Sequence, residues 1–271
     1  MPELPEVETT RAGLASHIVD QRVMQLAIRQ PSLRWPVPKE MPKYFDNQPI
    51  VSLQRRGKYL LLESLKCTAL IHLGMSGSLR ISSFDEALRT HDHWQMSLEN
   101  NTFLRYHDPR RFGAFLWAGS KPLEHKLIAS LGPEPLSEDF TAKRLYEMSR
   151  GRSLAVKNFI MDSKVVVGVG NIYANESLFQ SGIHPNRPAG KVSKARYEKL
   201  AREIKLVLAK AIESGGSTLR DYVNCSGAPG YFQQQLLVYG REGQACLVCD
   251  RELKQLRIGQ RSSVFCGNCQ S

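Results

Sequence analysis

The 271-residue sequence has no apolar run near the ~20 residues needed to cross a bilayer, so no membrane-spanning helix is expected. Its opening, MPELPE, is acidic and lacks the basic start and apolar centre of a signal peptide. We therefore predict a cytoplasmic protein without a membrane partner, in which cysteines stay reduced and serve more often as metal ligands than in disulfides. Internal repeats and low-complexity tracts are also absent, so a repeat architecture is not expected.

Acidic residues are too few to balance the basic ones, with 26 Asp and Glu against 37 Lys and Arg, a net charge of +11. Such a surplus favours a polyanionic partner, because neutralising phosphates releases their condensed counterions. Charge alone fits an ordinary basic protein equally well. The hydrophobic content of 42% and charged content of 23% are typical of globular proteins, and the length indicates two large units or two and a small one.

The residue pattern predicts an α+β multidomain protein that begins with a helix at Pro5–Ile18 and a β-sandwich over residues 1–120. Short runs rich in β-branched or aromatic residues follow the helix, separated by Gly, Asn or Pro. Strands at this spacing are typical of a sandwich or barrel. The predicted strands are Val23–Ile28, Ile50–Gln54, Tyr59–Leu65, Ala69–Leu73, Ser78–Ser82, Trp94–Leu98, Thr102–His107 and Ala114–Trp117.

A linker is predicted at residues 121–135, because it contains the turn-forming run Gly-Pro-Glu-Pro, and a helical domain at residues 136–237. Its predicted helices are Ser137–Arg150, Ser153–Met161, Ile172–Ser181 and Ser193–Ser214. The last helix carries an apolar stripe at helical spacing, which predicts a buried face: Tyr197, Leu200, Ala201, Ile204, Val207, Leu208 and Ala211. Residues 224–231, rich in Gly, Pro and Ser, indicate a loop.

The last predicted domain, residues 238–271, contains two CxxC pairs, Cys246 with Cys249 and Cys266 with Cys269, separated by 16 residues. Four thiolates at this spacing predict one structural Zn²⁺, with no position open for catalysis. The intervening segment is predicted to form a β-hairpin with Arg261 at its tip, which suits a DNA groove, although such ribbons also bind proteins. The other cysteines are Cys67, expected to be inert, and Cys225.

Separated motifs across the whole chain resemble those of the bacterial formamidopyrimidine-DNA glycosylases. They are PELPEVE at residues 2–8, HLGMSG at 72–77, DPRRFG at 108–113, GVGNIYA at 168–174, PGYF at 229–232 and the four-cysteine end. The resemblance implies a base-excision-repair enzyme with a helix–two-turn–helix domain, and without a sequence signal for an oligomer interface we expect a monomer. It would remove oxidised purines such as 8-oxoguanine from double-stranded DNA and cleave abasic sites, as a glycosylase and lyase associated with the bacterial nucleoid.

The N-terminus makes chemical sense of that activity. Once Met1 is removed, Pro2 carries a terminal amine that titrates near pH 8, so part of it is unprotonated and nucleophilic at neutral pH. Glu3 and Glu6 lie on one helix face beside it and can transfer protons. The resemblance gives Glu3 that role and Glu6 an assisting one; alternatively, both merely complement the helix dipole.

The resemblance also implies the residues that hold the DNA. Two of them, Lys58 and Arg261, count as catalytic as well. Met75, Arg110 and Phe112 would fill the gap left by an extruded base, since a thioether and an aromatic ring can enter the stack. The remaining predicted DNA contacts are His72, His91, Lys157, Asn171 and Tyr239, and a lid over the base would contribute Thr218 and Tyr222.

Less specific interpretations remain for several of these residues. His72 and Phe112 fit ordinary core packing, and Lys58 and Lys157 fit exposed surface lysines. Two other functions also remain open. One is an endonuclease VIII-like glycosylase for oxidised pyrimidines, and the other is a non-catalytic zinc-dependent DNA-binding protein.

Overall fold

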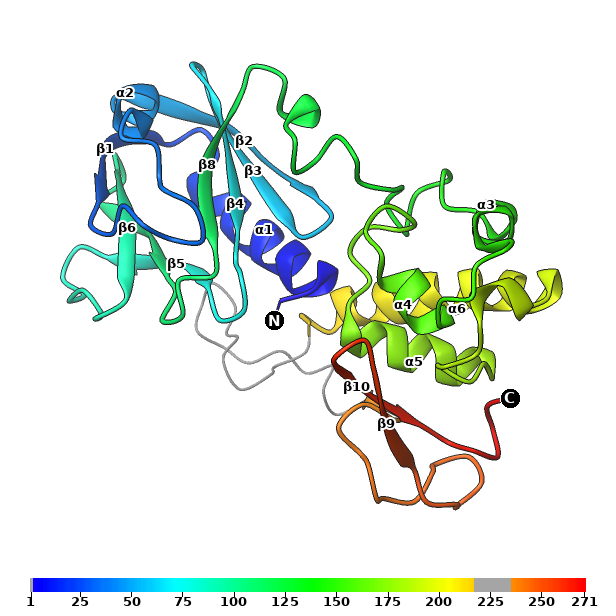
Figure 1. The fold of residues 1–271 in the computed structure, drawn as a ribbon. Coiled ribbons are helices and arrows are strands. Elements are labelled where there is room, and N and C mark those ends of the chain that lie inside the picture. The colour runs from blue at the N-terminus through cyan, green and yellow to red at the C-terminus, as the bar shows by residue number, and fades with distance from the viewer. Residues whose placement is uncertain (1, 217–234) are drawn as a thin grey trace. The chain divides into compact units, whose positions relative to one another are not determined.

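The computed structural model describes residues 2–216 and 235–271. The described residues form two compact units (Figure 1). The N-terminal unit comprises residues 2–129 and 214–216, and the C-terminal unit comprises residues 130–213 and 235–271. No helix within these residues is long and apolar enough to span a membrane.

The N-terminal unit consists of one long helix, a short helix and eight strands. α1 starts as the sequence predicts, with Pro5 in its first turn, and its side chains Val7, Leu14 and Ile18 enter the core of the unit. The elements are α1 (Leu4–Ile18), β1 (Arg22–Ile28), α2 (Met41–Phe45), β2 (Gln48–Arg56), β3 (Tyr59–Ser64), β4 (Thr68–His72), β5 (Ser78–Ser83), β6 (Asp92–Leu98), β7 (Thr102–His107), β8 (Ala114–Gly119) and the 3-10 turn η1 (Pro122–Glu124).

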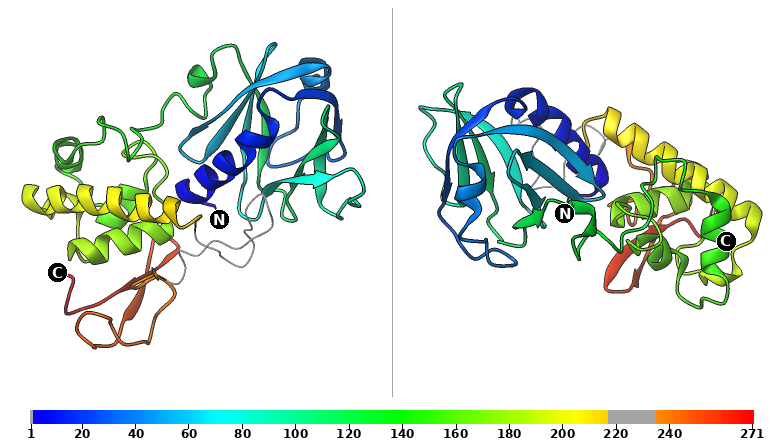
Figure 2. Two further views of the ribbon diagram at one scale, coloured as in Figure 1. Left: turned by 180° about the vertical axis from the view of Figure 1, so that it is seen from behind. Right: turned by 90° about the horizontal axis from the view of Figure 1, so that it is seen from above.

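The eight strands form one antiparallel sheet in the order β5-β7-β6-β1-β2-β3-β4-β8. β1 and β2 are in register over only two residue pairs, and there the sheet divides into two four-stranded halves (Figure 2). Trp94 on β6 stacks on Phe115 of β8 with ring centroids 4.5 Å apart, although the two strands lie far apart in the strand order. The halves therefore face each other across one apolar core, which confirms the predicted β-sandwich.

All eight predicted strands of this unit are present, with ends shifted by at most a few residues. The short helix α2 was not predicted. It has five residues, too few to show helical periodicity in the sequence, and its Met41 and Phe45 are fully buried. Burial in the completed core, a tertiary effect, stabilises it.

The C-terminal unit combines short and long helices with a hairpin. α6 buries the whole predicted stripe, from Tyr197 to Ala211, and ends before Gly215, which adopts a positive φ of 74°. The elements are α3 (Ala142–Ser149), α4 (Val156–Met161), α5 (Asn171–Ser181), the 3-10 turn η2 (Ala189–Lys191), α6 (Lys194–Glu213), β9 (Lys254–Ile258) and β10 (Arg261–Phe265).

Two helices are shorter than predicted, for local reasons. The Thr141 hydroxyl accepts a hydrogen bond from the backbone N–H of Arg144 at 3.2 Å, and this N-cap starts α3 later than expected. Ala155 forms an isolated antiparallel bridge with Pro188, which keeps Ala155 extended and delays α4 until Val156. Neither contact has a periodic signal in the sequence.

The C-terminal hairpin turns where the sequence predicts. Gly259 and Gln260 connect β9 to β10, and both have positive φ, 54° and 65°. Two such residues match the right-handed twist of a hairpin. The register pairs Arg261 with Ile258, which puts Arg261 beside the turn, where it is exposed.

Candidate functional site

The start of α1 holds the predicted nucleophile in a buried, hydrogen-bonded setting. Pro2 is buried, and Glu3 and Glu6 are each only 2% exposed. The backbone N–H of Glu3 donates to Glu6 Oε2 at 2.7 Å, as part of a capping box at the N-terminus of the helix. Glu6 therefore fixes the backbone beside Pro2. Gly216 approaches so closely that a Cβ there would lie 3.3 Å from the Glu6 side chain.

Lys58 follows Gly57, which has a φ of 58°, in the turn between β2 and β3. Arg55 connects this turn to α1: its Nε donates to Glu8 at 2.7 Å, and its terminal nitrogen donates to the Gly57 carbonyl at 3.1 Å. Burial alone would raise the pKa of Glu8, but its hydrogen bonds and ion pairs with Arg11 and Arg55 outweigh burial and lower it. The helix of Pro2 and the turn of Lys58 are thus tied together by an ionised carboxylate.

His72 ends β4 and is paired in register with Tyr59, with their rings 4.9 Å apart. Its Nδ1 accepts the N–H of Gly74 at 2.9 Å. Burial, with smaller contributions from the charges of Lys58 and Arg34, lowers the pKa of His72 to about 4. The ring is therefore neutral at pH 7 and carries its proton on Nε2, which makes it a hydrogen-bond donor without a charge.

A cavity of about 410 Å³ gathers several predicted DNA contacts of this unit. Arg34, His72, Gly74, Met75 and Phe112 line it. Met75 is 38% exposed and Phe112 46% exposed, so neither is a core residue. Two large apolar side chains exposed beside basic and donor groups suit a ligand with both stacked rings and phosphates.

The predicted contacts Arg110 and His91 lie in the same unit. The Arg110 guanidinium is 5.2 Å from the centre of the Phe112 ring, a cation–π contact at the exposed loop before β8. His91 precedes β6, with its ring 5.9 Å from that of His107. The β7–β8 loop thus presents a cation and an aromatic ring together, as the predicted wedge requires.

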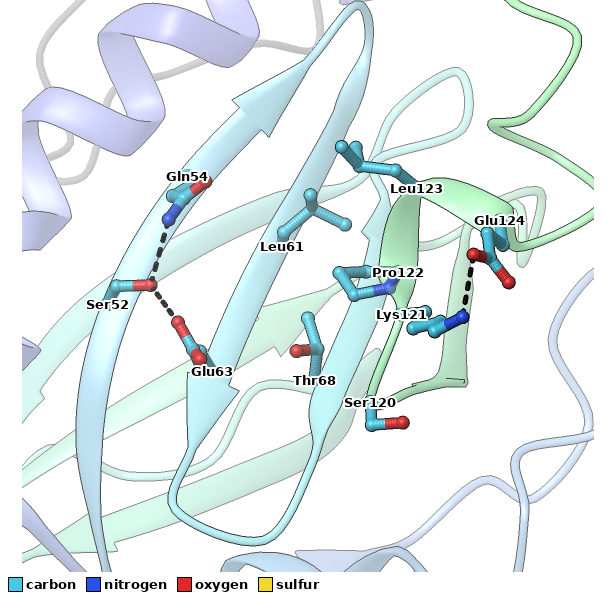
Figure 3. Close-up of a pocket in the computed structure, with 10 residues that line it drawn as sticks. All are labelled: Ser52, Gln54, Leu61, Glu63, Thr68, Ser120, Lys121, Pro122, Leu123 and Glu124. Atoms are coloured by element: carbon cyan, nitrogen blue, oxygen red, sulfur yellow. Dashed lines mark hydrogen bonds and ion pairs between the residues drawn. The ribbon is translucent and has the colours of Figure 1, made fainter.

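A larger cavity of about 460 Å³ lies elsewhere on the N-terminal unit, over β2, β3, β4 and η1 (Figure 3). Its polar groups pair with one another: Ser52 Oγ donates to Glu63 at 2.7 Å, and Lys121 lies 3.1 Å from Glu124. None of the predicted site residues lines it. The smaller cavity, in contrast, gathers basic and donor groups together with two exposed apolar side chains, so the smaller cavity is the candidate site.

Two predicted residues of the C-terminal unit lie on its helices. Asn171 opens α5 directly after its N-cap, Gly170, so it lies at the N-terminus of the helix, the end with partial positive charge. Lys157 on α4 is fully buried, and its Nζ donates to the Ser262 carbonyl at 2.7 Å and to Ser263 Oγ at 2.6 Å. Lys157 is therefore not an exposed surface lysine; it joins α4 to strand β10, next to Arg261.

The segment that carries Tyr239 is fixed by a buried carboxylate. Glu176 on α5 is 1% exposed and accepts the backbone N–H groups of Leu237, Val238 and Tyr239 at 2.9, 3.0 and 2.8 Å. Burial raises the pKa of Glu176 in spite of these three donors. One side chain thus sets the backbone path of a predicted DNA contact.

The four cysteines at the end of the chain fit one zinc ion. Their sulfur atoms all lie within 4.8 Å of one another, with Cys249 and Cys266 at 3.4 Å and Cys246 and Cys269 at 3.9 Å. Tetrahedral zinc with thiolates at ~2.3 Å requires separations of ~3.8 Å between sulfurs. This geometry assigns the chain one structural zinc.

Some predicted residues lie outside the described part of the chain or away from the site. Thr218, Tyr222 and Cys225 fall outside the described residues. Cys67 is in the apolar core of the N-terminal unit, where burial raises the pKa of its thiol, as expected for an inert cysteine.

Sequence reasoning missed three residues that the structure makes prominent. Arg34 lines the candidate cavity, Glu176 holds the Tyr239 segment, and Asp108, fully buried, bonds two site loops. Asp108 and Glu176 stand in or beside quoted motifs, which was the available signal. Arg34 offered none beyond its charge.

Comparison with known proteins covers the whole chain. Family models described as the N-terminal domain and the H2TH domain of formamidopyrimidine-DNA glycosylase match residues 1–115 and 131–223, and a zinc finger found in FPG and IleRS matches residues 243–271. Proteins named formamidopyrimidine-DNA glycosylase from Stutzerimonas stutzeri and Pseudomonas entomophila are 56% and 57% identical over 270 residues, covering 100% of each chain.

Solved structures agree with these matches. The Lactococcus lactis Fpg in complex with DNA containing an abasic site superposes with a TM-score of 0.93 at 32% identity, covering 100% of both chains. The MutM (FPG) protein of Thermus thermophilus gives a TM-score of 0.89 at 36% identity, covering 99% of this chain and 98% of that one. With relatives this similar over its full length, the chain belongs to the formamidopyrimidine-DNA glycosylase family.

Proposed function

We propose that this protein is a base-excision-repair enzyme that removes oxidised purines from duplex DNA and then cleaves the strand at the abasic site. The observation that carries this proposal is the match, along the entire chain and at 56% identity, to relatives named formamidopyrimidine-DNA glycosylase. The structures of the Lactococcus lactis protein with abasic DNA and with DNA containing N7-benzyl-Fapy-dG support the substrate class. The net charge of +11 suits a nucleic-acid ligand.

Pro2 is the proposed nucleophile, after removal of Met1. Its secondary amine attacks the anomeric carbon of the damaged nucleotide, the bond to the base breaks, and the base leaves with the bonding electrons and a proton. Opening of the sugar ring gives an iminium ion that joins Pro2 to the deoxyribose. This cation acidifies the adjacent carbon, so loss of a proton there expels the 3′ phosphate, and a second elimination expels the 5′ phosphate.

Glu3 is proposed to protonate the sugar oxygen as the ring opens, and Glu6 assists by holding the Glu3 backbone through its 2.7 Å hydrogen bond. Lys58 and Arg261 are proposed to act in the eliminations by binding the phosphates that leave. The buried setting of Glu3, at 2% exposure, supports a protected proton donor.

The remaining predicted residues are proposed to hold the DNA. His72, His91, Asn171 and Tyr239 would contact the backbone, while Met75, Arg110 and Phe112 would occupy the gap left by the extruded base. Lys157 would contribute through the hairpin strand to which it is bonded, and Thr218 and Tyr222 through a lid over the base. The exposure of Met75 and Phe112 beside Arg34 and His72 supports this division.

The domain organisation implied by this function is a catalytic domain at residues 1–120, a linker at 121–135, a DNA-binding domain at 136–237 and a zinc finger at 238–271. We also propose that the protein is a monomer. It would act in the bacterial cytoplasm in association with the nucleoid, because its substrate is chromosomal DNA.

Borohydride reduction tests the proposal directly. Protein freed of Met1 should form a covalent adduct with DNA containing 8-oxoguanine, because borohydride reduces the iminium to a stable amine. Pro2→Gly should weaken trapping, and Glu3→Gln should retain DNA binding while losing excision. Absence of an adduct would favour a non-catalytic DNA-binding protein, and faster excision of thymine glycol than of 8-oxoguanine would favour the endonuclease VIII type.

A further inference from the structure

Two loops of the N-terminal unit carry the side chains proposed to fill the gap in the DNA. The β4–β5 loop, residues 73–77, carries Met75, and the β7–β8 loop, residues 108–113, carries Arg110 and Phe112. The loops pack backbone against backbone: a Cβ on Gly74 would lie 2.5 Å from the nitrogen of Gly113. Gly74 also has a φ of 68°, so both the close approach and the backbone conformation at this position require glycine.

One carboxylate is bonded to both loops. Asp108 Oδ2 accepts the backbone N–H of Gly113, next to Phe112, at 2.8 Å, and Asp108 Oδ1 accepts the hydroxyl of Ser76, next to Met75, at 3.2 Å. A third donor, the Tyr106 hydroxyl, reaches Oδ2 at 3.1 Å from the core side. The carboxylate thus joins the two loops to each other and to the sandwich.

The setting of Asp108 makes these bonds strong and fixed. Its side chain is fully buried, and in such a setting of low dielectric constant hydrogen bonds are stronger than in water. The backbone of Asp108 is held as well, since its N–H donates to the His91 carbonyl at 3.1 Å and its carbonyl lies 2.7 Å from His93 Nε2. Asp108 does not itself line the cavity, and none of its surface is exposed to solvent.

We propose that Asp108 is a positioning residue for base extrusion, which holds Met75 and Phe112 in one arrangement by binding Ser76 and Gly113 at the same time. This inference rests on the proposed function. A wedge of two side chains from two loops can replace a stacked base only if their spacing is kept while the duplex pushes against them. Small displacements of positioned groups are known to cost much rate.

The test measures extrusion and chemistry separately. Single-turnover excision of 8-oxoguanine from a duplex needs the wedge, and 2-aminopurine placed beside the lesion reports unstacking by its fluorescence. Cleavage of a duplex with an abasic site needs no base to be extruded, and borohydride trapping on that substrate reports Pro2. The quantity of interest is the ratio of the excision rate to the abasic-site cleavage rate.

Asp108→Asn has the same shape but gives up one acceptor oxygen, so we expect excision to slow by about 10- to 100-fold with a smaller fall in abasic-site cleavage. Ser76→Ala removes only the tether to the Met75 loop, and should slow excision by about 3- to 10-fold. In a Phe112→Ala background, Asp108→Asn should reduce the ratio less than in the wild type, because the side chain to be positioned is gone.

Tyr106→Phe is the matched control, because it removes the third bond to Asp108, together with the longer 3.4 Å bond from the same hydroxyl to the His72 carbonyl, and leaves both loop tethers in place. It should retain the wild-type ratio and fluorescence change. If Tyr106→Phe lowers the ratio as much as Ser76→Ala does, Asp108 acts through the core and the inference is wrong. Ser76→Ala with a wild-type ratio would also overturn it, even if Asp108→Asn fails to fold in a thermal unfolding assay. A wild-type protein that forms no adduct would instead refute the proposed function.

Discussion

The N-terminal sandwich and the C-terminal zinc segment are stabilised in different ways. The sandwich has one apolar cluster of 24 buried residues, contributed by both halves of its sheet. The cluster beneath the zinc hairpin has six, and two of these are the ligands Cys246 and Cys266. An apolar core that large supports a fold by itself, whereas one that small needs a metal or other cross-links.

Buried polar contacts also have a different importance in the two regions. The hairpin is attached to the helices through Lys157, and through the N–H of Val264, which donates to Asn175 at 2.9 Å. In the sandwich, the bidentate pair of Arg80 and Asp92 adds to a core that already exists. The stability of the zinc segment should therefore depend on the metal and on polar bonds, and the stability of the sandwich on apolar packing.

Loss of zinc should have the largest effect. Cys266→Ser should unfold the segment from residue 238 onward and weaken DNA binding, because structural zinc supplies on the order of 10 kcal/mol in isolated fingers. Hydrogen exchange should show lost protection in β9 and β10 and unchanged protection in the sandwich. Cys67→Ala is the control, and should keep a full complement of zinc by mass spectrometry. If the hairpin amides stay protected from exchange after the zinc is removed by a chelator, the hairpin does not depend on zinc and this prediction is wrong.

Truncating a large side chain in the apolar core should destabilise the sandwich and leave the zinc segment intact. Trp94 is fully buried and stacks on Tyr106 and Phe115, so Trp94→Ala should destabilise the sandwich by about 3–5 kcal/mol. Urea unfolding measures the loss, and zinc content should not change. Trp117, half-exposed and stacked on Tyr44, provides the control, with an expected cost of about 1 kcal/mol. If both variants lose the same free energy of unfolding, apolar packing in the core does not dominate the stability of the sandwich.

The polar anchor of the hairpin should have an intermediate effect. Lys157→Met removes two hydrogen bonds and leaves Ser263 Oγ without its donor, at a cost of about 1–3 kcal/mol. Exchange should accelerate at residues 262–264 while zinc stays bound. Lys164→Met, at an exposed position, should change nothing. Unchanged exchange in Lys157→Met would mean that zinc alone holds the hairpin.

The smallest effect concerns pH and the sandwich. Because burial lowers the pKa of His72 from 6.5 to about 4, the unfolded chain takes up a proton below pH 6.5 before the folded chain does. The folded state therefore loses stability as pH falls from 6.5 towards 4, by about 1 kcal/mol between pH 7 and 5.5. Urea unfolding should show this slope in the wild type and a reduced one in His72→Gln. An NMR titration with a ring pKa near 6.5 would contradict it.

Much of this fold could be predicted from local patterns, because helical and strand periodicity recur over several residues of each element. The apolar stripe of α6 and the alternating strands of the sandwich are buried as expected, and the spacing of the four cysteines anticipated their cluster. The site was predicted less completely. The motif containing Asp108 was recognised, but nothing in it indicates that one carboxylate bonds Ser76, 32 residues earlier.

By itself the sequence determined where most of the helices and strands form, which four side chains bind zinc, and where a nucleophilic amine can arise. These properties depend on periodicity, spacing and the chemistry of single residues. Only the tertiary structure decided that Lys157 is buried, that His72 is neutral and that Arg34 joins the cavity. Burial and neighbouring charge are properties of distant segments brought together, and no local pattern carries them.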